Sequence, residues 1–150
     1  MGKSVHKLNH KEQHETLLVA IASQQNGYRL CWALNNSLNI SLSDADDFRI
    51  EHENLGNLFS SETETLSFPS FFYENEENNT TYRLLYNKHS DGHLIRSLKN
   101  VDFLLVVNAS KDAIDKKKLL DGIKQTGFTL MAFFTETQKL MSKERKILEF

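Results

Sequence analysis

Apolar residues gather in three short runs that lie far apart along the chain. Thr16–Ser23 is almost continuously apolar, and Val101–Val107 and Phe128–Thr135 repeat the pattern later in the sequence. A short apolar run without alternation is typical of a strand that is covered on both faces. These segments therefore predict three core strands.

One segment between the first two runs follows the 3.6-residue period of a helix. Asn26 is a suitable N-cap, and the helix is predicted to continue to about Leu38. Its core stripe is about 100° wide and consists of Leu30, Cys31, Leu34 and Leu38. This stripe indicates that one side of the helix packs on the sheet.

A second helix is predicted between the last two apolar runs. Ser110 and Asp112 are the candidate caps, and the helix should end near Thr126, just before Gly127. Its core face consists of Leu119, Leu120 and Ile123.

The middle of the chain predicts more polar strands. Asp46–Glu53 is interpreted as a short charged strand, whose carboxylates suit a sheet edge that resists pairing with other strands. Residues 54–66 are interpreted as an irregular loop. Phe68–Glu74 and Thr80–Asn87 are predicted to form a hairpin around residues 75–79.

Two helices for about six strands leave too few crossovers for a parallel sheet. The fold class predicted is therefore α+β, with a mostly antiparallel sheet and both helices packed on one face. Residues 1–150 are expected to form one domain, with residues 1–15 and the basic, partly helical residues 136–150 loosely ordered. The side chains expected in the core are Leu30, Leu34, Val101, Phe103, Leu105, Leu120, Ile123 and Phe134.

Composition and charge narrow the classes of function. The chain has 150 residues, 39% of them hydrophobic, which suits one folded domain. A net charge of −2 argues against a nucleic-acid-binding surface. The single cysteine, Cys31, excludes an internal disulfide and indicates a reducing compartment. The apolar runs are much shorter than a membrane span, and no signal sequence is evident, so a cytoplasmic protein without membrane contact is expected.

Residues 95–103 read IRSLKNVDF, and this segment resembles the motif of the IPExxxVDY family, an uncharacterised group of bacterial proteins. Ile95, Val101 and Asp102 match the motif at the same spacing, and Phe103 stands in place of its Tyr. Two upstream segments, 28–35 and 82–88, resemble the family as well. The resemblance implies a bacterial, intracellular origin and brings no established activity.

Two residues depart from the motif, because Arg96 and Ser97 stand where the family has Pro and Glu. The physical interpretation of the segment is a turn that leads into a core strand. Asp102 at the strand start is expected to accept hydrogen bonds from backbone amides of the preceding loop.

Motifs of common enzymes are missing from the sequence. The six glycines are too widely spaced for a phosphate-binding loop, and there is no Gly-x-Ser-x-Gly elbow. A catalytic alternative would use Ser90 as a nucleophile with His89 or His93. The turn-forming sequence of residues 90–92 explains these residues without catalysis. We therefore expect no catalytic residues and no cofactor, and a protein that is not an enzyme.

His6, His10 and His14 recur every four residues and would share one side of a helix. Nothing around them is apolar enough to hold a metal-binding geometry, so no metal site is expected.

Tyr28, Arg29 and Trp32 are the candidate binding residues. Tyr28 and Trp32 fall opposite the core stripe of the first helix, and these three residue types are enriched at interface hot spots. Three explanations remain: cover by a segment of the same chain such as residues 54–66, a protein interface, or a ligand platform. The function predicted is non-enzymatic binding of a protein partner or a second copy, which makes a dimer one possible form. The alternative is a small-ligand-binding regulatory domain.

Overall fold

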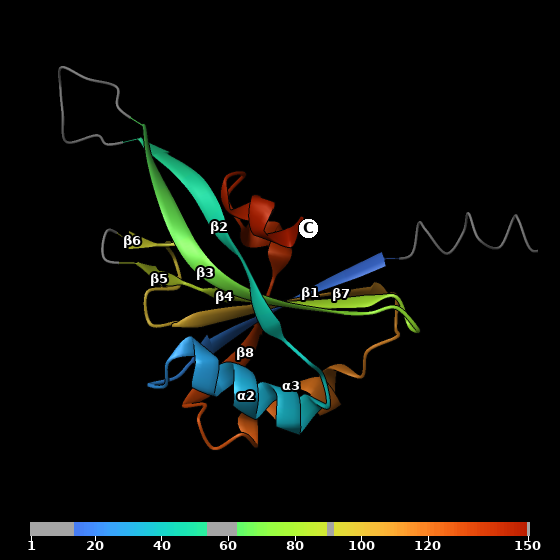
Figure 1. Cartoon of the computed structure of the whole chain (residues 1–150). Coiled ribbons are helices and arrows are strands. Elements are labelled where there is room, and N and C mark those ends of the chain that lie inside the picture. Colours follow the sequence, from blue (N-terminus) through green and yellow to red (C-terminus); the bar gives the residue numbers. More distant parts are fainter. Residues whose placement is uncertain (1–13, 54–62, 90–91, 150) are drawn as a thin grey trace, which may run out of the picture.

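The computed structural model describes residues 14–53, 63–89 and 92–149, and its main feature is a six-stranded antiparallel sheet (Figure 1). The strand order is β2-β3-β4-β7-β1-β8. The sheet strands are β1 (His14–Ala22), β2 (Ser43–Glu53), β3 (Thr63–Asn75), β4 (Thr80–Tyr86), β7 (Phe103–Ser110) and β8 (Met131–Thr135). A separate two-residue pair joins β5 (Lys88–His89) to β6 (Gly92–His93). The predicted α+β class and antiparallel sheet are confirmed.

Two helices, α2 (Gly27–Leu38) and α3 (Lys116–Lys124), lie side by side on one face of the sheet, as predicted (Figure 1). The predicted cap of the first helix is confirmed, because the Asn26 side chain accepts a hydrogen bond of 2.9 Å from the Arg29 amide. Gly27 then passes so close to Tyr86 that a Cβ atom there would clash with its ring. None of the helices in the described part of the chain is long and apolar enough to cross a membrane.

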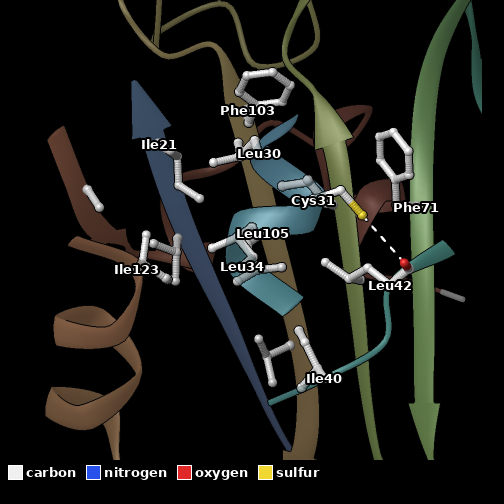
Figure 2. Close-up of a cluster of buried hydrophobic side chains, with 14 of the residues drawn as sticks. Ile21, Leu30, Cys31, Leu34, Ile40, Leu42, Phe71, Phe103, Leu105 and Ile123 are labelled. Atoms are coloured by element: carbon white, nitrogen blue, oxygen red, sulfur yellow. Dashed lines mark hydrogen bonds between the residues drawn. The ribbon is translucent and has the colours of Figure 1, made fainter. Parts of the chain in front are cut away.

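Strand β1 has apolar cover on both faces, which explains its unbroken apolar sequence. Leu17, Val19 and Ile21 point toward the helices, where they join Leu30 and Leu34 in the core shown in Figure 2. Leu18 and Ala20 belong to a second core on the opposite face. That second core also contains Leu66, Phe68, Leu85, Leu94, Ile95, Leu104, Val106, Leu140 and Ile147. The prediction of a doubly covered strand is confirmed.

Six of the eight side chains expected in the core are buried: Leu30, Leu34, Val101, Phe103, Leu105 and Ile123. The other two, Leu120 and Phe134, are only half-buried. Leu119 and Ile123 occupy the positions of α3 that face the core, so Leu120 lies on the flank of the helix. Phe134 lies on β8, which is the last strand of the sheet and has a neighbour on one side only.

Two predicted boundaries near the C-terminus are wrong. The cap of α3 is Asp115, which accepts a 3.1 Å bond from the Lys118 amide, rather than Ser110 or Asp112. Asp112 has a positive φ of 62°, so it ends a turn and cannot begin the helix. Strand β8 starts three residues later than predicted, because Phe128 and its neighbours form a turn around the hydroxyl of Thr126.

Two strands from the middle of the sequence are longer than predicted. β2 begins at Ser43, and β3 already includes Thr63–Leu66, which was interpreted as loop. The rest of that loop, residues 54–62, lies outside the described residues. The predicted hairpin at residues 75–79 is confirmed, since β3 ends at Asn75 and β4 starts at Thr80. β2 is the edge strand that its acidic sequence predicted.

The C-terminal segment forms two short 3-10 helices, Thr137–Lys139 and Glu144–Leu148. The sequence predicts a loosely ordered tail here, but Leu140 and Ile147 are buried in the second core. The segment therefore covers the face of the sheet that the helices leave open (Figure 1).

Candidate interaction surface

The outer side of α2 carries the two predicted aromatic residues. Tyr28 and Trp32 are each 65% exposed, although Leu30, Ala33 and Leu34 on the same helix are buried. Residues 54–62, which make up most of the segment named as possible cover for this pair, lie outside the described residues. The Tyr28 ring also meets the Phe71 ring in a T-shaped arrangement, with the ring centroids 5.4 Å apart. Two large aromatic side chains thus remain in water on one helix face.

A shallow groove of about 340 Å³ lies beside this pair and is lined by Tyr28, Arg29, Trp32 and Phe128. We call these four residues the aromatic surface. Phe128 comes from the turn before β8, so the groove joins α2 to the start of that strand. The next exposed apolar side chains along the chain, Leu130 and Met131, continue the apolar character past the groove.

Charge on the aromatic surface comes from Arg29, whose guanidinium donates a 3.3 Å hydrogen bond to the side chain of Gln25. Asp44 on β2 lies near the hydroxyl of Tyr28, and its negative charge raises the pKa of that phenol. The tyrosine therefore stays a neutral hydrogen-bond donor at physiological pH. Together the residues offer rigid aromatic area with one cation beside it, a composition typical of protein-binding hot spots.

The two edge strands of the sheet differ in a way that bears on this surface. β2 carries Asp44, Asp46, Asp47 and other charges, and its pairing with β3 contains a bulge between Ala45 and Phe48. Both features discourage a further strand from pairing there. β8 has the sequence MAFFT, with no charge and no proline, and its register with β1 is regular. The edge of β8 therefore lacks the protection that the opposite edge has.

The predicted alternatives for chemistry lie only partly within the described residues. His14 is the first residue of β1, while His6 and His10 lie outside the described residues. In the short pair β5–β6, His89 pairs with Gly92 and His93 pairs with Lys88, while Ser90 and Asp91 lie outside the described residues. Over the described ranges, no three His, Cys, Asp or Glu side chains gather as metal ligands would.

Asp102 has a structural role that differs from the predicted one. Its carboxylate accepts a 2.8 Å bond from the amide of Ser23 at the end of β1, and it lies 2.7 Å from the ammonium of Lys88. The expectation of bonds to the preceding loop is therefore wrong in its partner, since the amide belongs to the residue that directly follows β1. Asp102 thus connects the start of β7 to the end of β1.

Cys31 is buried as predicted, and its thiol donates a weak 3.4 Å hydrogen bond to the carbonyl of Leu42 (Figure 2). Burial, together with the negative charge of Asp44, raises the pKa of the Cys31 thiol to about 11. A thiol in this state is a poor nucleophile at neutral pH.

Sequence reasoning missed a pocket on the face of the sheet opposite the helices. It measures about 400 Å³, a size common for sites of small ligands. β2, β3, the turn after β6 and the C-terminal segment each contribute part of the wall. We call it the basic pocket, because its lining includes Arg96, Lys99 and Lys143. Nothing in the sequence indicates that residues 50 and 144 lie close together, so the pocket could be found only from the fold.

No family model, curated protein or solved structure matches this chain. The resemblance of residues 95–103 to the IPExxxVDY motif therefore remains a prediction. We infer a function from the geometry of the chain itself.

Proposed function

We propose that this protein is a non-enzymatic interaction domain that associates with a second copy of itself through the aromatic surface. The observation that carries the proposal is the 65% exposure of both Tyr28 and Trp32 on a helix that otherwise packs against the core. Tyr, Trp and Arg together are the residues that contribute most to binding energy at protein interfaces.

The aromatic pair alone gives too small an interface for a stable dimer. Because both copies of a two-fold dimer would bury the pair, its contact would remove on the order of 400–600 Å² from water, roughly 10–15 kcal/mol at 25 cal/mol per Å², whereas a specific interface buries about 1,200–2,000 Å². Association costs about 4–15 kcal/mol because the two molecules lose translational and rotational freedom. A stable contact therefore needs more surface than Tyr28 and Trp32 provide.

The edge of β8 supplies a surface of the right kind. It begins three residues after Phe128, and its sequence places no charge opposite a second copy of the same strand. Two β8 edges can pair antiparallel across a two-fold axis without like charges meeting, whereas two β2 edges would bring acidic side chains together. This self-complementarity favours a second copy over an unrelated partner.

The experiment is sedimentation velocity over a range of protein concentrations. Trp32→Ala should weaken dimerisation by roughly 30-fold or more, because truncating a hot-spot residue typically costs about 2 kcal/mol or above. Its melting temperature as a monomer should change little, since Trp32 contributes little to the core.

The matched control is Met141→Ala, which removes an exposed apolar side chain beside the second core, on the other face of the sheet, and should leave dimerisation unchanged. A wild-type protein that stays monomeric at every concentration would refute self-association. A Trp32→Ala variant that dimerises normally but melts far lower would show that the residue serves stability instead.

A further inference from the structure

The basic pocket lies apart from the aromatic surface and has the composition of a ligand site. Its apolar lining comes from Ile50, Leu66 and Leu94, with Met141 at the margin. Leu66 and Leu94 are buried members of the second core, so this part of the wall is fixed by packing. Met141 is 60% exposed, and a flexible thioether at a rim can adapt to an apolar guest.

The charged lining of the pocket has an excess of positive charge. Arg96, Lys99 and Lys143 are cationic, and two carboxylates, Glu51 and Glu144, oppose them. Glu144 is buried, and its two oxygens accept hydrogen bonds from the backbone amides of Arg96 at 3.0 Å and Met141 at 2.9 Å. Three cations and two carboxylates give the lining a formal charge of +1.

The same two hydrogen bonds of Glu144 connect opposite walls of the pocket. One wall is the turn that carries Arg96, and the other is the C-terminal segment that carries Met141. A site whose walls are linked before a ligand arrives loses less entropy when the ligand binds.

Asn87 holds the turn that carries Arg96 through hydrogen bonds of its side chain. It is completely buried, and its side chain accepts a 2.8 Å bond from the Ile95 amide and donates bonds of 2.9 and 2.8 Å to the carbonyls of Leu98 and Val101. The turn between Ile95 and Val101 is thus held at both ends. Arg96 and Lys99 project from a backbone of fixed shape.

We propose that the basic pocket binds a small organic anion, a carboxylate with an aliphatic or aromatic body. The apolar wall would take the body, and the cationic rim would take the carboxylate. A single unbalanced positive charge suits a monoanion better than a phosphate ester. The proposal is independent of self-association, because it uses other residues on the other face of the sheet.

The test is titration of the protein with octanoate, followed by calorimetry and by amide chemical shifts in ¹⁵N-labelled protein. Octanoate should bind with one-to-one stoichiometry and shift the amides of residues 92–99 and 141–144. Octanol, which has the same chain without the charge, should bind at least about tenfold more weakly. The double variant Arg96→Gln/Lys99→Gln should weaken octanoate binding roughly tenfold or more.

The matched control is Lys117→Gln/Lys118→Gln, which removes the same charge from exposed positions on α3. It should bind octanoate as the wild type does. Met141→Gln should reduce affinity for octanoate and octanol alike, since it changes only the apolar rim. All of these side chains are exposed, so melting temperatures should stay close to that of the wild type.

Three results would overturn the proposal. The first is an absence of octanoate binding at millimolar concentration. The second is equal affinity for octanoate and octanol, which would exclude a role of the cations. The third is an equal loss of binding in both double variants, which would indicate general attraction to a positively charged protein.

Discussion

Asn87 is the residue whose replacement tests the architecture most directly. It follows the end of β4, has no exposed surface and makes three side-chain hydrogen bonds to the turn between Ile95 and Val101. Asn87→Ala removes all three bonds and leaves the Ile95 amide and the Val101 carbonyl without this partner, while the Leu98 carbonyl still accepts a bond from the Val101 amide. A buried polar group that loses its partner costs about 1–3 kcal/mol.

The sum of two such losses would be roughly 2–6 kcal/mol, but water can enter the space left by the side chain and replace part of the lost hydrogen bonding. We therefore expect Asn87→Ala to lower the free energy of unfolding by about 2–4 kcal/mol. Urea denaturation followed by circular dichroism measures this loss. With a slope of about 2 kcal/mol per molar urea, the midpoint should fall by roughly 1–2 M.

Two further variants show whether the hydrogen bonds cause the effect. Asn100→Ala changes an exposed asparagine on the same turn and should cost less than about 0.5 kcal/mol. Asn87→Asp keeps the shape but replaces the donor with an oxygen that faces two carbonyls, so at pH 7 it should be at least as destabilising as Asn87→Ala. A loss below about 1 kcal/mol for Asn87→Ala would refute the reasoning and would indicate that Glu144 alone holds the turn.

Three other predictions concern the core, the thiol and the N-terminus. Leu34→Ala, at a side chain with no exposed surface, should lower the free energy of unfolding by about 2–5 kcal/mol in the same denaturation assay, and a loss below about 0.5 kcal/mol would contradict its place in the core. Cys31 should react with a disulfide reagent at pH 8 only after denaturant is added. Because burial raises the pKa of Cys31 to about 11, ionisation of the thiol opposes folding, and stability should fall more steeply in the wild type than in Cys31→Ala as the pH rises from about 9 through about 11. Calorimetric titration with zinc should show no stoichiometric site, and a site that disappears in a His6/His10/His14 triple alanine variant would contradict this prediction.

The parts of the fold that could be predicted from sequence are those with a strong local pattern. Thr16–Ser23 has unbroken apolar character because β1 is covered on both faces, and no other strand environment produces that pattern as readily. The start of α2 could be predicted because Asn26 is a good cap at the correct distance from the apolar stripe. Both signals lie within a few residues of the structure they specify.

The wrong boundaries arose where several local signals compete. Ser110, Asp112 and Asp115 are all residue types that cap helices, and the sequence alone does not rank them. The choice of Asp115 depends on a turn, in which the Ala113 amide donates to the carbonyl of Ser110 and Asp112 takes a positive φ. Tertiary packing of the helix determines where that turn is placed.

The cover of the second face could not be predicted, because its residues are sparse and distant. Leu140 and Ile147 are separated by a mostly polar segment, so neither helical nor strand periodicity marks them as core residues. Their burial depends on the open face of a sheet formed by strands more than 30 residues earlier. The same long-range assembly creates the basic pocket. In contrast, Tyr28 and Trp32 were identified because one helix determines their relation to each other.

The two proposed sites should act independently, because a packed sheet separates them. The aromatic surface lies on the side of α2, where Tyr28 meets Phe71 of the helix-side core. The basic pocket contacts the other core through Leu66 and Leu94. β1 and β7 lie between these cores with buried side chains on both faces, and close-packed strands have no second arrangement that a ligand could select.

Coupling between two sites requires a change that both of them influence, and it must be equal in both directions. Saturating octanoate should therefore leave the dimer dissociation constant within about twofold, which is a coupling below about 0.5 kcal/mol. Trp32→Ala should in turn leave octanoate affinity unchanged within the same range. A shift of about fivefold or more in either measurement would show that the sheet transmits the binding event. Ligand binding in the basic pocket would then regulate dimerisation, and the two sites would not be independent.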